Sequence, residues 1–223
     1  LSTLAAIGNV LVKDSTNEFF LKSQKIFYDI KNQQISSQSK SQFEDILGNL
    51  ILSKDFIFKK NEDLIKFNNV EVIDLQKNSL VLDKAFMNVA SKKLIGKDVV
   101  IEFKDQSFEK NNEPRLKGNS ISIDQDKTII KNGVFTSCKR NDDCPPWQLS
   151  AKEIKHDKKK KIISYKSAWL KIYDTPVFYF PKFFHPDPTV KRQSGFLMPS
   201  FMDSTNLGSS FQLPYYHAIS DNK

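Results

Sequence analysis

Residues 99–104 read Val99-Val100-Ile101-Glu102-Phe103-Lys104, and this stretch shows the pattern on which the fold depends. Apolar residues stand at 99, 101 and 103, and polar residues stand at 102 and 104. Successive side chains point to opposite faces of a β-strand, so this spacing predicts a strand with one buried face.

The same alternation recurs along the chain. Ile121 and Ile123 alternate with polar neighbours, and so do Leu170 and Ile172. Polar turns separate the runs, a strand follows about every ten residues, and no helical stripe occurs before residue 185. The sequence therefore predicts an all-β fold of stacked short strands. Further strands are predicted over 22–35, 49–52, 55–59, 64–67, 70–75, 79–83, 128–130, 134–138 and 161–166.

Two internal repeats support stacking of one strand unit. Residues 8–12 (GNVLV) recur as 48–52 (GNLIL), and the pattern Lys25, Phe27, Ile30, Ile35 recurs at positions 84, 86, 89 and 94. Stacked strands enclose an elongated interior lined by their inward side chains. That interior is either an ordinary core or an apolar trough for a lipid. Its predicted lining is Val70, Val72, Leu82, Val99, Ile101, Phe103, Ile121 and Ile123.

The composition excludes several classes of protein. The 223 residues include 34 Lys and Arg against 26 Asp and Glu, a net charge of +8, with no 18-residue apolar run for a transmembrane helix. Lysines are scattered except for Lys158–Lys161, a run expected in a solvated turn. No nucleic-acid-binding motif accompanies the charge, so nucleic acid is not an expected partner.

Catalytic motifs are absent from the sequence. It contains no G-x-S-x-G elbow, no phosphate-binding loop and no H-E-x-x-H pair, and its three histidines are dispersed. We expect a protein that is not an enzyme, with no catalytic residues and no cofactor.

Cys138 and Cys144 lie close together in a turn-rich segment. A disulfide, to each other or to cysteines outside this chain, requires an oxidising compartment. Free thiols are one alternative. A metal site is another, but zinc needs about four ligands and only His156 stands nearby as a third. We expect no metal.

The pattern changes after residue 174. Residues 177–180 form an aromatic strand, and Pro181, Pro186 and Pro188 stiffen the connection that follows. Over 207–218, apolar residues alternate with small or polar ones, as in a membrane β-barrel strand or a soluble hairpin.

The segment 132–220 carries a dense series of motifs in order. They are NGVFTSC (132–138), PPWQLSA (145–151), SAWLKIYDTPVFYFP (167–181), KRQSGFLMPSF (191–201) and FQLPYYHAIS (211–220). This series resembles the lipopolysaccharide-assembly outer-membrane protein family (LptD or OstA). The upstream GNV and GNL strands resemble that family's jelly roll more loosely.

The resemblance implies a periplasmic OstA-like β-jelly roll over 1–185. Residues 186–223 would be a linker and the first strands of an outer-membrane β-barrel, cut off where the sequence ends. It implies transport of lipopolysaccharide into the outer leaflet of the outer membrane, with acyl chains carried in the jelly-roll interior. The implied partners are lipopolysaccharide, a periplasmic jelly-roll bridge protein docked edge to edge, an outer-membrane lipoprotein plug and the membrane itself. The alternative is a soluble periplasmic bridge or binding protein of the same fold.

The resemblance also assigns roles to single residues. Cys138 matches a family cysteine that pairs with one near the end of the barrel, while Cys144 has no fixed place in the pattern. Gly195, Phe196, Leu197 and Pro199 match the first barrel strand, and Pro214 falls in the second. Proline cannot donate to a strand ladder, so Pro199 and Pro214 would weaken a lateral gate between these strands.

Overall fold

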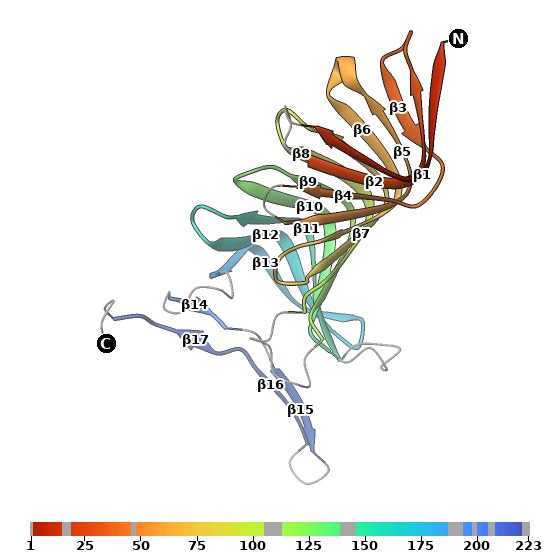
Figure 1. The fold of residues 1–223 in the computed structure, drawn as a ribbon. Coiled ribbons are helices and arrows are strands. Elements are labelled where there is room, and N and C mark those ends of the chain that lie inside the picture. Colours follow the sequence, from red (N-terminus) through yellow and green to blue (C-terminus); the bar gives the residue numbers. More distant parts are fainter. Residues whose placement is uncertain are drawn as a thin grey trace. The chain divides into compact units, whose positions relative to one another are not determined.

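The computed structural model describes residues 2–14, 19–45, 48–104, 113–138, 146–186, 194–197, 200–204 and 208–219 (Figure 1). The described residues form antiparallel strands and one 3-10 turn, Lys60–Glu62, which confirms the all-β prediction. Within this part of the chain, no helix is long and apolar enough to cross a membrane.

The chain divides into two compact units. The first comprises Leu1–Gln106 with Arg115–Gln125, and the second comprises Ser107–Pro114 with Asp126–Lys223. The first unit contains β1 (Thr3–Asp14), β2 (Phe19–Asp29), β3 (Gln34–Ser37), β4 (Ser41–Asp45), β5 (Leu50–Lys59), β6 (Leu64–Ile73), β7 (Ser79–Asn88), β8 (Lys93–Glu102) and β9 (Arg115–Ile123). The second contains β10 (Lys127–Thr136), β11 (Trp147–Asp157), β12 (Ile162–Ile172), β13 (Thr175–Pro186), β14 (Gly195–Phe196), β15 (Ser200–Ser204), β16 (Gly208–Gln212) and β17 (Tyr215–Tyr216).

Strands of the first unit pair in chain order, except that β3 and β4 share one place between β2 and β5. β3 pairs with one half of β2 and β4 pairs with the other half. The segment predicted as one strand over 22–35 therefore contains β2, a turn and the start of β3. Likewise, the strands predicted over 49–52 and 55–59 are the two halves of β5, and those over 64–67 and 70–75 are the two halves of β6.

Each long strand of the first unit has an irregularity near its middle. On β6, the inward residues are Ile65 and Phe67, then Val70 and Val72, so the spacing changes from two to three residues once. Asn69 stands at the change with a φ of 46°, in the left-handed region. The pairing of β6 with β5 and β7 keeps its register through Asn69, so the neighbouring strands turn at the same level and share one bend. Without it, one half of the strand would turn its apolar side outward.

The bends fold the first unit back on itself. Phe19 and Tyr28 are nine residues apart on β2, which is about 30 Å of straight strand. Yet the ring of Phe19 lies 6.0 Å from that of Phe58, whose strand neighbour Ile35 is itself paired with Tyr28. We call the halves the first arm (19–23, 41–45, 50–53, 70–73, 79–82, 99–102, 115–118) and the second arm (26–29, 34–37, 56–59, 64–67, 85–88, 93–97, 120–123). Two antiparallel layers facing one core are the arrangement of a jelly-roll-type fold.

The strands of the second unit contain the same kind of mid-strand bend. Asn132 on β10 and Ser167 on β12 have φ values of 49° and 52° in mid-strand. β10 to β13 pair in order, and the short ladders β14–β17 and β15–β16 follow. The Lys158–Lys161 run lies in the turn between β11 and β12, as predicted, where Lys159 Nζ lies 2.7 Å from the carboxylate of Asp126.

Substitution at the bend tests this account of the fold. Asn69→Val places a β-branched residue at a left-handed position, which should lower the free energy of unfolding by about 1–2 kcal/mol. Asn69→Gly should be close to neutral. Lys66→Val, at an exposed regular position of the same strand, is the matched control and should not destabilise. Urea unfolding measures all three, and an Asn69→Val variant as stable as the control would contradict the role of the bend.

Candidate functional site

The candidate site is the inward face between the two arms of the first unit. Three predicted lining residues form a row beside the bend. Val70 on β6 is paired with Leu82 on β7, and Val99 occupies the equivalent inward position on β8. Each of the three is at most 1% exposed. The row is therefore completely apolar and dry.

A second row of the first arm lies further from the bend. Val72 is paired with Leu80, Leu80 with Ile101, and Ile101 with Leu116. Val72 and Ile101 are half-buried, as is Phe103, which follows the end of β8. These side chains lie nearer the opening between the arms than Val70, Leu82 and Val99.

The last two predicted lining residues belong to the second arm. Ile121 is paired with Gly96 and Ile123 with Leu94. Ile121 is buried and Ile123 is half-buried. The structure thus brings all eight predicted residues to one inward face, but it divides them between two opposing layers. Whether they bind lipid stays a prediction.

Sequence reasoning missed the aromatic side chains that join the arms. The ring of Phe43 on the first arm lies 4.9 Å from Phe56 and 5.1 Å from Phe67 on the second arm, in edge-to-face geometry. Phe19 approaches Phe58 in the same way. We call these five residues the Phe43 cluster. Such pairs contribute about 0.5–1.5 kcal/mol each beyond their area, so they hold the arms together.

Close packing extends along the interior. A Cβ added to Gly96 would lie 2.6 Å from Leu82 Cδ1, although the two residues belong to opposite arms. The interior is therefore filled by the protein's own side chains, and room for another apolar group would require the arms to separate. The described ladders pair neighbouring strands and continue through the bend, and none of them joins the two facing layers across the interior. Separation of the layers therefore exchanges side-chain contacts and leaves these backbone hydrogen bonds intact.

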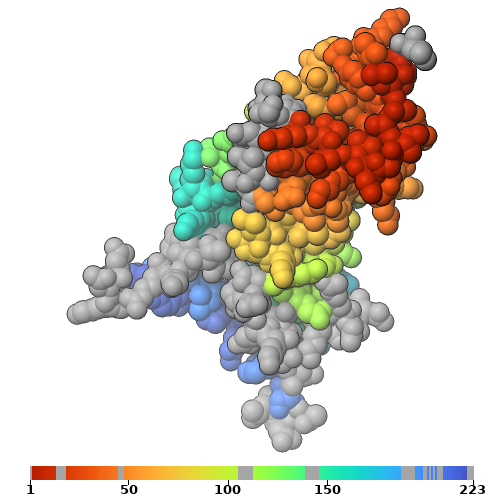
Figure 2. All heavy atoms as spheres, in the orientation of Figure 1, coloured from red at the N-terminus to blue at the C-terminus, as the bar shows by residue number. Residues whose placement is uncertain are grey.

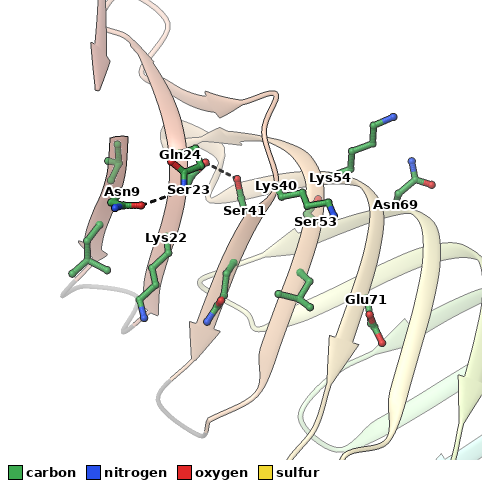
Figure 3. Close-up of a pocket in the computed structure, with 14 residues that line it drawn as sticks. Asn9, Lys22, Ser23, Gln24, Lys40, Ser41, Ser53, Lys54, Asn69 and Glu71 are labelled. Carbon is green, nitrogen blue, oxygen red and sulfur yellow. Dashed lines mark hydrogen bonds between the residues drawn. The ribbon is translucent and has the colours of Figure 1, made fainter. Parts of the chain in front are cut away.

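A hollow of about 810 Å³ lies on the other face of the first arm, near the bend (Figure 3). Lys22, Gln42 and Glu71 line it, and they alternate with the buried residues of the interior. Beside it, the buried hydroxyl of Ser23 lies 3.0 Å from both Ser37 and Ser41. Its lining combines ammonium, amide, hydroxyl and carboxylate groups with the apolar side chains of Val10, Leu11 and Leu52, and the hollow lies on the face opposite the interior.

The second unit has its own inward face. Ile154, Tyr165 and Phe183 are paired in one row across β11, β12 and β13, and Leu149, Leu170 and Phe178 in another. Phe183 also lies 5.4 Å from Phe196 of β14. Aromatic side chains thus continue from the last long strand into the short ladder.

Tyr165 and His185 form the polar contact of this face. The Tyr165 hydroxyl lies 3.0 Å from His185 Nε2, and His185 Nδ1 lies 2.7 Å from the carbonyl oxygen of Pro186. A carbonyl only accepts, so Nδ1 carries the proton, and in the neutral ring Nε2 accepts from the tyrosine. Burial raises the pKa of Tyr165 above its ordinary value.

The residues predicted for a lateral gate lie partly in the β14–β17 ladder. Gly195 is paired with Tyr216 and Phe196 with Tyr215. The strand predicted over 207–218 is wrong as one element, because it is divided into β16 and β17. Pro214 lies between them, since it has no N–H for the ladder, and its carbonyl accepts from the Leu197 N–H at 2.8 Å. Pro199 lies outside the described residues.

Cys138 is half-buried after β10. Its N–H donates to Thr136 Oγ1, and its Sγ lies 3.7 Å from the Trp147 carbonyl oxygen. Cys144 lies outside the described residues, so the disulfide stays a prediction. Among the residues described, no group of His, Cys, Asp and Glu side chains could hold a metal.

The described fold is of the jelly-roll type, and comparison with known proteins supports the particular family that the motifs indicated. No protein-family model matches the chain. Over 95 residues it is 41% identical to the LPS-assembly protein LptD of Yersinia pestis bv. Antiqua (strain Antiqua). It is 38% identical to that of Sodalis glossinidius (strain morsitans) and 37% to that of Salmonella typhi. These matches confirm the resemblance to the lipopolysaccharide-assembly outer-membrane protein family. They cover 43% of this chain and 12% of each relative.

Tyr165 generates a prediction for alkaline stability. The unfolded chain releases the tyrosine proton near its ordinary pKa of about 10, while the folded chain retains it. Unfolding then becomes more favourable as pH rises, so the stabilisation is complete below about pH 10 and lost above it. The free energy of unfolding should fall more steeply between about pH 9 and pH 11 in the original chain than in Tyr165→Phe. Tyr179→Phe, at an exposed tyrosine, should retain the steep fall, and equal slopes in all three would refute the assignment.

Proposed function

We propose that this chain transports lipopolysaccharide to the outer leaflet of the outer membrane without acting as an enzyme. Residues 1–185 are the periplasmic jelly roll, and residues 186–223 are a linker and the first strands of a membrane β-barrel. The observation that carries the proposal is the apolar inward face shared by two arms that no described ladder joins, together with the similarity to LptD proteins.

The two arms supply the apolar surface that an acyl chain needs. Each CH₂ group exposed to water costs about 0.8 kcal/mol, so a lipid in transit requires an unbroken apolar surface. The buried rows of Val70, Leu82 and Ile121 provide such a surface on both layers. When the arms part, lipid tails take the place of protein side chains, and apolar contact is exchanged for apolar contact. Movement of the lipid therefore needs no catalytic group.

The edge strand β1 is the proposed docking site for the periplasmic bridge protein. It is paired on one side with β2 and ends the strand order of the sheet. Leu4, Ile7 and Leu11 are exposed along it, at the surface shown in red in Figure 2. An edge strand with free backbone groups accepts another strand by β-augmentation. The lipoprotein plug is the partner proposed for the barrel.

The ladder after residue 194 is the proposed lateral gate. Gly195, Phe196 and Pro214 take part in it, and Pro199 is assigned to it from the motif. The ladder is interrupted between β14 and β15 and between β16 and β17. Interrupted pairing lowers the cost of separating two strands. The exposed apolar residues of this ladder also disfavour the alternative of a soluble bridge protein, because Leu197, Met202 and Tyr215 face outward.

Photo-crosslinking tests the conduit. A photoreactive residue at Ile101, on the inward face, should label with lipopolysaccharide during transport. The same residue at the neighbouring Glu102 should label much less, because adjacent side chains point to opposite faces. Equal labelling from both positions would sink the proposal.

Loosening the Phe43 cluster tests whether the arms must part. Phe43→Leu keeps an apolar side chain but loses two edge-to-face contacts, so it should cost roughly 1–3 kcal/mol of stability. It removes the two ring contacts across the interior, so lipopolysaccharide labelling from position 101 should rise. Phe86→Leu, at an exposed phenylalanine of β7, is the matched control. A Phe43→Leu variant that stays folded and labels no better than the control would show that the cluster does not limit entry.

A further inference from the structure

The second unit concentrates its exposed apolar side chains at one end of the chain. β10 and β11 carry no large exposed hydrophobic residue among those described. From β12 onward there are eleven: Trp169, Tyr173, Val177, Phe178, Tyr179, Phe184, Leu197, Met202, Tyr215, Tyr216 and Ile219. Exposed apolar groups gathered in this way mark an interaction surface.

The outward face of β12 and β13 holds an aromatic pair. Trp169 is paired with Tyr179 in the ladder, and their rings lie 4.9 Å apart. Both are 42% exposed. Both also belong to the face opposite the inward residues Ala168 and Leu170. The pair is therefore not part of the interior site.

Positive charge borders this pair. Lys166 and Lys182 lie directly opposite one another on β12 and β13. Glu153 faces Lys166 from β11, but a hydrogen bond from Lys131 holds it and keeps its pKa below the ordinary value. The row thus contains three lysines and one glutamate. Lys166 and Lys182 also line a hollow of about 250 Å³ beside Phe184, which is 59% exposed.

We propose that this outward patch, formed by Lys166, Trp169, Tyr179, Lys182 and Phe184, rests on the surface of an anionic lipid bilayer. The inference depends on the proposed function, because it places the second unit beside a membrane. Tryptophan and tyrosine favour the boundary between headgroups and acyl chains, where an apolar ring and a polar tip are both satisfied. The excess lysine charge is complementary to lipid phosphates, and the hollow beside Phe184 gives a headgroup room to meet both ammonium groups.

The fluorescence of Trp169 is a built-in probe for this surface. Its two tryptophans are Trp147, which is 4% exposed, and Trp169. Trp147→Phe leaves Trp169 as the sole emitter. Vesicles of phosphatidylcholine and phosphatidylglycerol, at about seven to three, should shift its emission to the blue. Brominated phosphatidylcholine in the same vesicles should quench it. If Trp147→Phe fails to fold, subtracting the spectrum of Trp169→Phe from that of the original chain gives the same readout.

Two double variants test the charge. Lys166→Ala with Lys182→Ala should weaken vesicle binding roughly 30-fold at low salt. Lys84→Ala with Lys97→Ala removes another directly opposed lysine pair, on β7 and β8, and is the matched control. It should weaken binding less than about threefold. If both double variants lost the same amount of vesicle binding, the effect would depend on net charge alone, and the proposal would be overturned.

Other outcomes also overturn it. An emission spectrum unchanged by vesicles would show that the patch does not meet the bilayer. A blue shift without bromine quenching would show that protein, not lipid, covers Trp169. The Lys166 and Lys182 variant should still label with lipopolysaccharide from position 101, so failure of the membrane contact is distinguishable from failure of the conduit.

Discussion

The alternation of side chains along a strand is the constraint from which the rest of this structure follows. A straight strand offers one apolar face, and it cannot fold over a core and keep that face inward on both halves unless its in-out alternation shifts by one residue. Asn69 and Asp98 provide the shift on β6 and β8 by adopting the left-handed conformation, which asparagine and aspartate tolerate better than β-branched residues do. Each strand then contributes to both arms, and the core between them is apolar from two sides.

Under the proposed function, this construction makes one surface serve as core and as conduit. The ladders hold each arm as a sheet, whereas contacts such as Phe43 with Phe56 and Phe67 hold the arms to each other. Backbone hydrogen bonds are costly to leave unpaired, while apolar contacts are non-directional and can be exchanged for others. Separation of the arms around a lipid chain is therefore cheaper than separation of neighbouring strands. The Phe43 cluster fills the interior and keeps it dry, and in the proposed function acyl chains take over its contacts without exposing apolar surface to water.

The sequence predicted the strands well because alternation is a local signal. It could not predict that the breaks near residues 54 and 69 are bends within β5 and β6, because a bend within a strand and a short turn leave similar traces in a polar stretch. The eight inward residues were found by their spacing, but their division between two arms depends on long-range pairing. The Phe43 cluster was missed for the same reason. Pro214 was placed inside a strand by its neighbours, although its missing N–H ends the ladder there.

The last long strand, β13, does not show the alternation of apolar and polar side chains that the rest of the chain shows. β13 places Phe178 and Phe183 on the same side as Leu170 and Tyr165, although Phe178 is exposed, and the positions Val177, Tyr179 and Phe184 are apolar and exposed as well. An antiparallel strand with water on one side alternates apolar and polar residues. A strand apolar on both faces is stable only where both faces meet an apolar medium, at about 25 cal/mol for each Å² removed from water. A lipid-carrying interior on one side and a bilayer surface on the other would meet that requirement, and water on the outward side would not.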